Sequence, residues 1–526
     1  MRHEPISFLA LVLTSLGPLL VSLDVSITNA VQPAIGRSLH GVSMAEISWT
    51  ITAYAITFAA TLVPAGRIAD RAGRRRTFIG GMALFALASL VCAAAPDLPV
   101  LIMGRVLQGC GAAAAQPASL GLLLALAPSA RRSVLTARWA AAGAAGIALG
   151  PLVGGAIAVL ISWRWAFLVN VPIVALACLL TPRAVPETQR HPGRSLPDPL
   201  GAVALAGAAA LIALAISQLT TWGAGDRRTE AAVLLGLLLG AGFMARCRRV
   251  GDPLLRLDLL RNRPFALLTL TTVLYAASFF GLLFSFVLFL TTEWRLSIVE
   301  AGLNIVPMAL VNIALAPIVG RLPARFGFPA PLAAGAGIMS IGLLLTATVQ
   351  AGHSFHASWI ITSTLIGVGI ALCYLLLGAA AVADVPHREL AAATGLNQCA
   401  RQLGAALGIA AVVAAIGAGS HTSVARFHLA WLICAGFSSL AVLSAGSLAI
   451  LRRTRPGDPQ PSERVVHIAH AAGERMPTTY LCGAPVRRLI ARTQPGHGPR
   501  GGGVCATCAQ LDAAGAAHER SHSGSG

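Results

Sequence analysis

Two ionisable side chains of opposite charge interrupt long apolar stretches of the sequence. Asp24 lies inside the stretch that begins near Phe8, and Arg105 lies inside the one that begins near Leu98. Gln108 follows one helical turn after Arg105, so a helix would place both side chains on one face. A charge at the centre of a membrane span costs about 3 kcal/mol, and such residues mark proton or substrate sites. The alternatives are an acid near the outer membrane surface with access to water, and an arginine that caps one end of the helix bundle.

Of these residues only Asp24 can take up and release a proton, since a guanidinium stays charged and must face a cavity or a partner. Other polar residues in the apolar stretches are candidates for the same proton and substrate pathway: Asn29, Gln116, Asn304, Asn397 and Arg401. Asn397 and Arg401 stand at the head of the thirteenth stretch, where they either line a cavity or anchor the helix end.

The composition indicates the class of protein that must position these side chains. The chain has 526 residues, of which 56% are hydrophobic and 11% are charged. Soluble domains carry about 25% charged residues, so the sequence predicts a polytopic membrane protein. The net charge of +19 would ordinarily favour nucleic-acid binding. Here the arginines lie in short loops and in the tail, so membrane topology accounts for the excess and no nucleic-acid partner is expected.

About fourteen apolar stretches reach the length of about 20 residues that a membrane helix needs. They begin near Phe8, Ala45, Thr77, Leu98, Val134, Trp165, Pro199, Ala231, Phe265, Ile298, Pro329, Ala357, Ala391 and Phe427. The predicted fold class is an all-α membrane protein with two six-helix halves, residues 1–181 and 265–451. Residues 182–264 supply two linking helices with cytoplasmic loops, and residues 452–526 form a largely disordered cytoplasmic tail. Arginine-rich loops alternate with poorer ones, which predicts that both termini are cytoplasmic.

The stretch Gly66–Arg76 places one acid among five arginines between two spans, and its glycines predict a short loop. Its candidate gating residues are Gly66, Asp70, Arg71, Gly73, Arg74 and Arg75. The stretch is either a charged latch between two halves or an anchor that only orients the protein. A related stretch, 320–327, keeps both glycines and two arginines but has Ala324 at the position of Asp70. Two related halves are typical of a secondary transporter.

The fifth span carries a motif of small residues that shapes the backbone. Gly146, Gly150 and Gly154 recur at four-residue spacing, which lets another helix approach closely on that face. Pro151 removes one hydrogen bond inside the helix and favours a kink, and Gly155 completes the motif. The alternative is ordinary packing of small residues.

Four stretches together carry a family resemblance. They are Gly66–Arg76, Leu23–Pro33, Arg105–Gly111 and Gly146–Gly155, the last followed by Trp163–Pro172. In this order and spacing they resemble the signature motifs of the fourteen-span drug:proton antiporters of the major facilitator superfamily, over nearly all of residues 8–451.

The resemblance implies a major facilitator fold and proton-coupled export of amphipathic or cationic drugs by alternating access. It places Arg105 in the proton relay and Asp24 in substrate or proton binding. It also implies a bacterial inner-membrane protein, linked to antibiotic resistance, whose partners are small-molecule drugs or metabolites, protons and lipid. A monomer without an essential cofactor is expected. No phosphate-binding loop that ends in Lys-Ser or Lys-Thr is present, so neither ATP use nor an enzymatic activity is predicted.

Two other functions stay open: a dedicated exporter of one endogenous metabolite or lipid, and a membrane sensor with a metal-binding tail. The tail supplies one histidine and three cysteines, a set that suits tetrahedral zinc: His470, Cys482, Cys505 and Cys508. The alternative is a flexible tail whose reduced cysteines are incidental.

Overall fold

The computed structural model describes residues 7–453, except 40, 127–131, 189–197, 251–252, 349–355, 384, 386–388 and 418–422. Over these ranges the regular secondary structure is helical, and fourteen helices are long and apolar enough to cross a membrane. The predicted all-α class and number of spans are therefore confirmed. The four predicted metal ligands, His470, Cys482, Cys505 and Cys508, lie outside the described residues.

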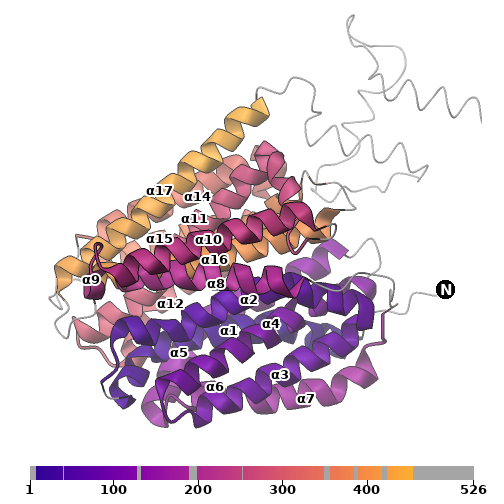
Figure 1. Cartoon of the computed structure of the whole chain (residues 1–526), viewed down its shortest axis with the longest axis horizontal. Coiled ribbons are helices and arrows are strands. Elements are labelled where there is room, and N and C mark those ends of the chain that lie inside the picture. Colours follow the sequence, from indigo (N-terminus) through magenta and orange to yellow (C-terminus); the bar gives the residue numbers. More distant parts are fainter. Residues whose placement is uncertain are drawn as a thin grey trace, which may run out of the picture. The chain divides into compact units, whose positions relative to one another are not determined.

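The first six spans form one group of helices (Figure 1). They are α1 (Phe8–Ser38), α2 (Met44–Ala72), α3 (Arg74–Ala94), α4 (Leu98–Leu126), α5 (Arg132–Leu160) and a sixth span made of α6 (Trp165–Leu168) and α7 (Asn170–Ala184). Within this group α1 packs against α5, and α4 packs against both α2 and α3.

The last six spans form a second group with the same pattern of packing. They are α11 (Arg263–Thr292), α12 (Ile298–Val319), α14 (Pro329–Thr346), α15 (His356–Ala383), α16 (Leu390–Ile416) and α17 (Val424–Arg453). Here α11 packs against α16 as α1 does against α5, and α15 packs against both α12 and α14. The groups meet where α2 contacts α16 and where α5 contacts α12. The membrane helices belong to one compact unit, Met1–Gly320 with Phe328–Arg452; the described part of a second unit includes α13 (Leu322–Phe326).

Two linking helices, α8 (Pro199–Ser217) and α10 (Arg227–Arg249), are joined through the short α9 (Leu219–Trp222). They pack against each other, and α8 also contacts α2 and α16 (Figure 1). Asp198 caps α8 and accepts hydrogen bonds from Arg246 Nε of α10 at 2.8 Å to each carboxylate oxygen. This hydrogen bonding from Arg246 holds the pKa of Asp198 below its usual range. A segment with the short helix η2 (Leu257–Arg261) then leads into α11.

The predicted loop at Gly66–Arg76 is much shorter than expected. Helix α2 continues to Ala72 and α3 begins at Arg74, so Gly73 alone separates the two helices. Its φ of 106° lies in the region that favours glycine, whereas the charged residues on either side are good helix formers. The predicted loop shrinks to one residue because Gly73 alone makes the turn, whereas Gly66 lies inside α2.

Glycines bring the backbones of paired helices into contact in both groups. A Cβ atom on Gly146 would meet the Leu19 carbonyl oxygen of α1, and one on Gly408 would meet the Ala277 carbonyl oxygen of α11. Since both pairs join corresponding helices of the two groups, this shared contact supports the internal repeat that the sequence predicts.

We expect Gly408→Val to lower the free energy of unfolding by about 1–3 kcal/mol, because the new side chain would force α16 away from α11. Gly378→Val on α15 is the matched control, since a Cβ there has no atom within 4 Å. Unfolding of the purified protein in mixed micelles measures both. Equal losses in the two variants would contradict the close-contact explanation.

Candidate functional site

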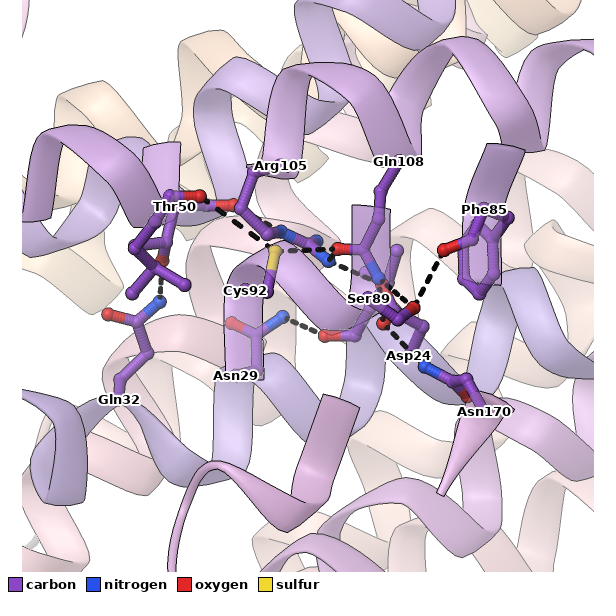
Figure 2. A network of polar contacts seen from close by, with 12 residues as sticks. Asp24, Asn29, Gln32, Thr50, Phe85, Ser89, Cys92, Arg105, Gln108 and Asn170 are labelled. Atoms are coloured by element: carbon purple, nitrogen blue, oxygen red, sulfur yellow. Dashed lines mark hydrogen bonds and ion pairs between the residues drawn. The ribbon is translucent and has the colours of Figure 1, made fainter. Parts of the chain in front are cut away.

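Asp24 and Arg105 form an ion pair that is almost completely shielded from solvent. Arg105 Nη1 lies 2.5 Å from Asp24 Oδ2, and the side chains are 0% and 1% exposed. The other carboxylate oxygen, Oδ1, accepts hydrogen bonds from Gln108 Nε2 at 3.3 Å and from Asn170 Nδ2 at 3.2 Å. Three spans therefore converge on one carboxylate: α1 carries it, and α4 and α7 supply the donors (Figure 2).

The guanidinium of Arg105 is oriented by further contacts with α2. Its Nε donates to the backbone oxygen of Thr50 at 2.7 Å, and its central carbon lies 4.4 Å from the centre of the Tyr54 ring. Such a cation–π contact is strongest where the cation is removed from water, as it is here. The arginine is thereby held between α1 and α2 while it remains bonded to Asp24.

Gln108 connects the ion pair to α3. Its Oε1 accepts from Arg105 Nη1 at 2.6 Å, and its Nε2 donates to Ser89 Oγ at 2.7 Å as well as to Asp24. Ser89 in turn donates to the Phe85 backbone oxygen at 2.8 Å (Figure 2). Both ends of the amide are thus bonded, which a buried polar network requires in order to be stable.

The contacts determine how Asp24 could exchange a proton. Each of its partners, Arg105, Gln108 and Asn170, donates to a carboxylate oxygen. A proton on Oδ2 would face the guanidinium, donor against donor, so protonation requires that the two side chains separate. The contacts around Asp24 therefore match an ionised carboxylate.

Asp24 is the one acidic residue that the described spans carry away from their ends. The other acids of these helices lie in a first or last turn: Glu46, Asp70, Glu230 and Glu300. Glu46 and Glu300 complete capping boxes with Ser43 and Ser297. Within the described spans, a proton carried by a carboxylate through the middle of the bundle would therefore be carried by Asp24.

The glycine motif of α5 faces α1, the helix that carries Asp24. A Cβ on Gly150 would collide with Ser26, and one on Gly154 would lie 3.2 Å from the Ala30 Cβ. Pro151 has no N–H to donate to the carbonyl of Ile147, four residues earlier. Ser26 Oγ donates to that carbonyl at 2.8 Å instead. The kink-forming proline and the ion-pair helix are thus joined by a hydrogen bond.

The charged motif around Gly73 is bonded mainly within the first group of helices. Asp70 Oδ1 lies 3.3 Å from Arg74 Nη2, and Arg74 Nη1 donates to the Gly121 backbone oxygen at 2.9 Å. Glu187 accepts from the backbone N–H of Arg75 at 2.9 Å. Glu187 was missed from the sequence because the acid stands alone in an arginine-rich stretch.

The two remaining candidates of this motif show different surroundings. A Cβ on Gly66 would have no atom within 4 Å, and the Arg71 side chain is exposed. A neighbouring residue, Arg67, donates from Nη2 to the Pro253 backbone oxygen at 2.5 Å. This bond joins α2 to the segment that leads into the second group, which is the kind of contact that a latch requires.

A small apolar cavity of about 30 Å³, enough for about one water molecule, lies between α5, α11, α12 and α15. Its walls include Ile147, Pro151, Phe279, Met308, Asn312 and Tyr374. Sites for drug-sized molecules measure about 300–1,000 Å³, so such a molecule would fit here only after the surrounding helices move apart. Asn312, rather than the predicted pathway residue Asn304, faces this space; Asn304 Nδ2 instead donates to the Glu300 backbone oxygen at 2.9 Å.

The remaining predicted pathway residues are dispersed. Asn29 donates to the Val25 backbone oxygen of its own helix at 3.0 Å, and Gln116 is half-buried on α4. Asn397 donates to Thr272 Oγ1 at 2.8 Å and so joins α16 to α11. The Arg401 guanidinium lies 5.2 Å from the centre of the Tyr374 ring. The structure therefore brings Asp24, Arg105 and Gln108 together and places the other five elsewhere.

Comparison with known proteins identifies the family. The model of the Major Facilitator Superfamily matches residues 14–409, and it matches residues 268–492 as well. The chain belongs to the major facilitator superfamily. Overlapping matches of one family model to both groups of helices accord with the repeat seen in their packing.

Curated relatives of the chain include proteins named for drug resistance. The tetracenomycin C resistance and export protein of Streptomyces glaucescens is 32% identical over 419 residues, which cover 78% of this chain and 77% of that protein. The lincomycin resistance protein of Streptomyces lincolnensis is 32% identical, covering 79% of this chain and 85% of that protein. The drug efflux pump JefA of Mycobacterium tuberculosis is 31% identical, covering 76% and 79%.

Solved structures show the same fold. The xylose transporter XylE from E. coli, in a partially occluded inward-open conformation, aligns with a TM-score of 0.58 at 15% identity, covering 84% of this chain and 98% of that one. A peptide transporter in complex with sulfate aligns with a TM-score of 0.63 at 15% identity, covering 84% and 94%. The predicted major facilitator fold is confirmed.

We expect Asp24→Asn to lower the free energy of unfolding by about 3–5 kcal/mol, because it leaves the Arg105 guanidinium buried without a counter-charge. Arg105→Gln should cost a similar amount, and the double variant should lose much less than the sum. Unfolding in mixed micelles measures all three. Arg246→Gln, which breaks a half-exposed pair, is the comparison and should cost about 1 kcal/mol or less. Strictly additive losses at Asp24 and Arg105 would show that the pair is not coupled.

A second expectation concerns the bond between Ser26 and the carbonyl of Ile147. Ser26→Ala should cost about 1 kcal/mol, because it leaves a part-buried carbonyl without a donor. In a Pro151→Ala background the restored backbone N–H can bond to that carbonyl, so the same serine substitution should cost clearly less. The same unfolding measurement tests this, and an equal cost in both backgrounds would assign the loss to packing against Gly150.

Proposed function

We propose that this protein is a proton-coupled exporter that moves amphipathic small molecules out of the cell by alternating access. It is a transporter rather than an enzyme. The proposal rests above all on Asp24, the acid buried at the centre of the described spans and bonded to Arg105. The resistance and efflux names of its relatives support drugs as the substrates.

The proposed cycle follows from the bonds of the ion pair. With substrate in the cavity and Asp24 ionised, α1 and α4 stay joined through Arg105. After the bundle opens outward, separation of the pair lets a proton bind to the Asp24 carboxylate. When the bundle then opens to the cytoplasm, the proton is released and the ion pair forms again. The change to the outward-open state thus needs bound substrate, and the change back to the inward-open state needs a bound proton.

The hydrogen bond of Ser26 connects the helix that carries the ion pair to the wall of the cavity. Helix α1 carries both Asp24 and Ser26, and Ser26 holds the carbonyl of Ile147. Ile147 and Pro151 line the cavity. A movement of α1 that accompanies protonation would therefore displace part of the cavity wall, which is a physical requirement for antiport.

We further propose an inner-membrane location with both termini in the cytoplasm. Fourteen spans are an even number, so the two ends of the membrane region face the same side. The arginines near Gly73 and after Arg246 would place that side in the cytoplasm. A single chain with protons and substrate, and without a cofactor, is sufficient for the cycle.

Proteoliposomes with an acidic lumen and a trapped pH-sensitive dye test the coupling. External tetracenomycin C, the compound named by one relative, should enter in exchange for protons and raise the lumenal pH. Asp24→Asn should reduce this change to that of protein-free liposomes, because the variant has no exchangeable proton at the pair. Glu230→Gln, an exposed acid in the first turn of α10, is the control and should behave as wild type.

Persistent proton exchange in Asp24→Asn would show that another acidic residue carries the coupled proton. Failure of the wild type with tetracenomycin C, together with normal folding, would favour a dedicated exporter of another molecule. In that case, profiling of metabolites that accumulate in a deletion strain would be the way to the substrate.

A further inference from the structure

The cavity between α5, α11, α12 and α15 has an electrostatic character that restricts what it can bind. Its lining residues are apolar except for Asn312 and Tyr374, and no acidic side chain is among them. Two of the lining side chains are aromatic, Phe279 and Tyr374, with ring centres 6.1 Å apart. Such walls favour flat aromatic ligands, and the Asn312 amide can donate or accept one hydrogen bond.

The helices of the second group offer no nearby carboxylate either. Over their described residues, α11, α14, α15, α16 and α17 contain no aspartate or glutamate. Helix α12 has Glu300, which lies in its first turn and accepts from the backbone N–H of Ser297 at 2.8 Å. Glu300 is one helical turn before Asn304, and Asn304 itself does not line the cavity.

The charge that the structure shows beside the cavity wall is positive. The Arg401 guanidinium lies over the ring of Tyr374, with 5.2 Å between its central carbon and the ring centre. One aromatic wall residue therefore already interacts with a cation. A second cation in the cavity would meet both a weakened attraction to that ring and repulsion from Arg401.

Asp24, the interior acid of the first group of helices, does not supply a negative charge to the cavity. Asp24 is bonded to Arg105 at 2.5 Å, so the pair contributes no net charge. Use of Asp24 as a counter-ion for a cationic substrate would leave Arg105 buried and unpaired. A permanent cation in this cavity would lose its hydration without gaining a counter-charge, and aromatic contacts return only part of that loss.

We propose that the substrates of this cavity are uncharged planar aromatic compounds with a hydrogen-bonding group, and that permanent cations bind poorly. The inference rests on the proposed exporter function and narrows it, since the family resemblance by itself implied cationic drugs as well.

Two ligands with one tricyclic skeleton test the proposal: 10-methylacridone, which is uncharged and carries a carbonyl, and 10-methylacridinium, which is a permanent cation. Both are fluorescent, so their binding to the purified full-length protein in lipid nanodiscs can be followed by polarisation. We expect 10-methylacridinium to bind at least about tenfold more weakly, which corresponds to about 1.4 kcal/mol.

Asn312→Asp adds a carboxylate to the cavity with little change in size, and it should strengthen binding of 10-methylacridinium and narrow the difference. Asn312→Leu is the matched control, since it removes the amide without adding charge and should not improve binding of the cation. Met308→Trp should weaken both ligands by filling the cavity, which shows that binding occurs there.

Three results would overturn the proposal: equal affinity of the wild type for both ligands, tighter binding of the cation, or no binding of either ligand. This binding assay needs no proton gradient, so its outcome is separate from that of the proteoliposome assay. A preserved preference for 10-methylacridone without proton exchange would count against proton-coupled export of tetracenomycin C and would still support the proposed ligand class. Proton exchange together with equal binding of both ligands would support the exporter and contradict the proposed ligand class.

Discussion

The buried pair of Asp24 and Arg105 is the interaction on which the arrangement of the first six spans depends. Two charges removed from water need hydrogen bonds to most of their donors and lone pairs, and Arg105 Nη2 is a donor that has none among the described residues. Removal of either partner would leave the other charge stranded. This requirement explains why α2, α3 and α7 each contribute groups around a contact made by α1 and α4. Five helices thereby meet around one carboxylate.

Close backbone contact between α1 and α5 extends this dependence to the cavity. Gly146 and Gly150 allow the approach, and Ser26 supplies the donor that the Ile147 carbonyl lacks because Pro151 follows four residues later. The three residue types therefore have separate roles. The glycines allow α1 and α5 to approach, the proline leaves a carbonyl without its helical donor, and the serine donates a hydrogen bond to that carbonyl. Without the Ser26 donor, the carbonyl of Ile147 would lose the hydrogen bond that the structure shows for it.

Much of the fold, and the centre of the site, could be predicted from sequence because both depend on properties local to the chain. Apolar length predicted the spans, and the cost of a charge in lipid singled out Asp24 and Arg105. Asn170 and Ser89 were not predicted, because burying an uncharged polar residue in lipid costs much less free energy than burying a charge. Only the packing of α3 and α7 shows that both residues join the network. The short connection at Gly73 was missed because charged residues suit a helix end as well as a loop. Which of two asparagines on α12 faces the cavity depends on how that helix is rotated, and no local pattern encodes this.

The scarcity of acids links the energy source to the choice of substrate. If the one interior carboxylate of the described spans neutralised a cationic substrate, Arg105 would be left buried without its counter-charge. An uncharged substrate avoids this cost, because it makes no demand on Asp24. Exchange of one proton for one uncharged molecule then moves one positive charge across the membrane. The membrane potential adds about 2.3 kcal/mol per 100 mV to such an exchange, whereas exchange of a proton for a monovalent cation moves no net charge. An acid-poor cavity is therefore suited to export driven by both the pH difference and the membrane potential.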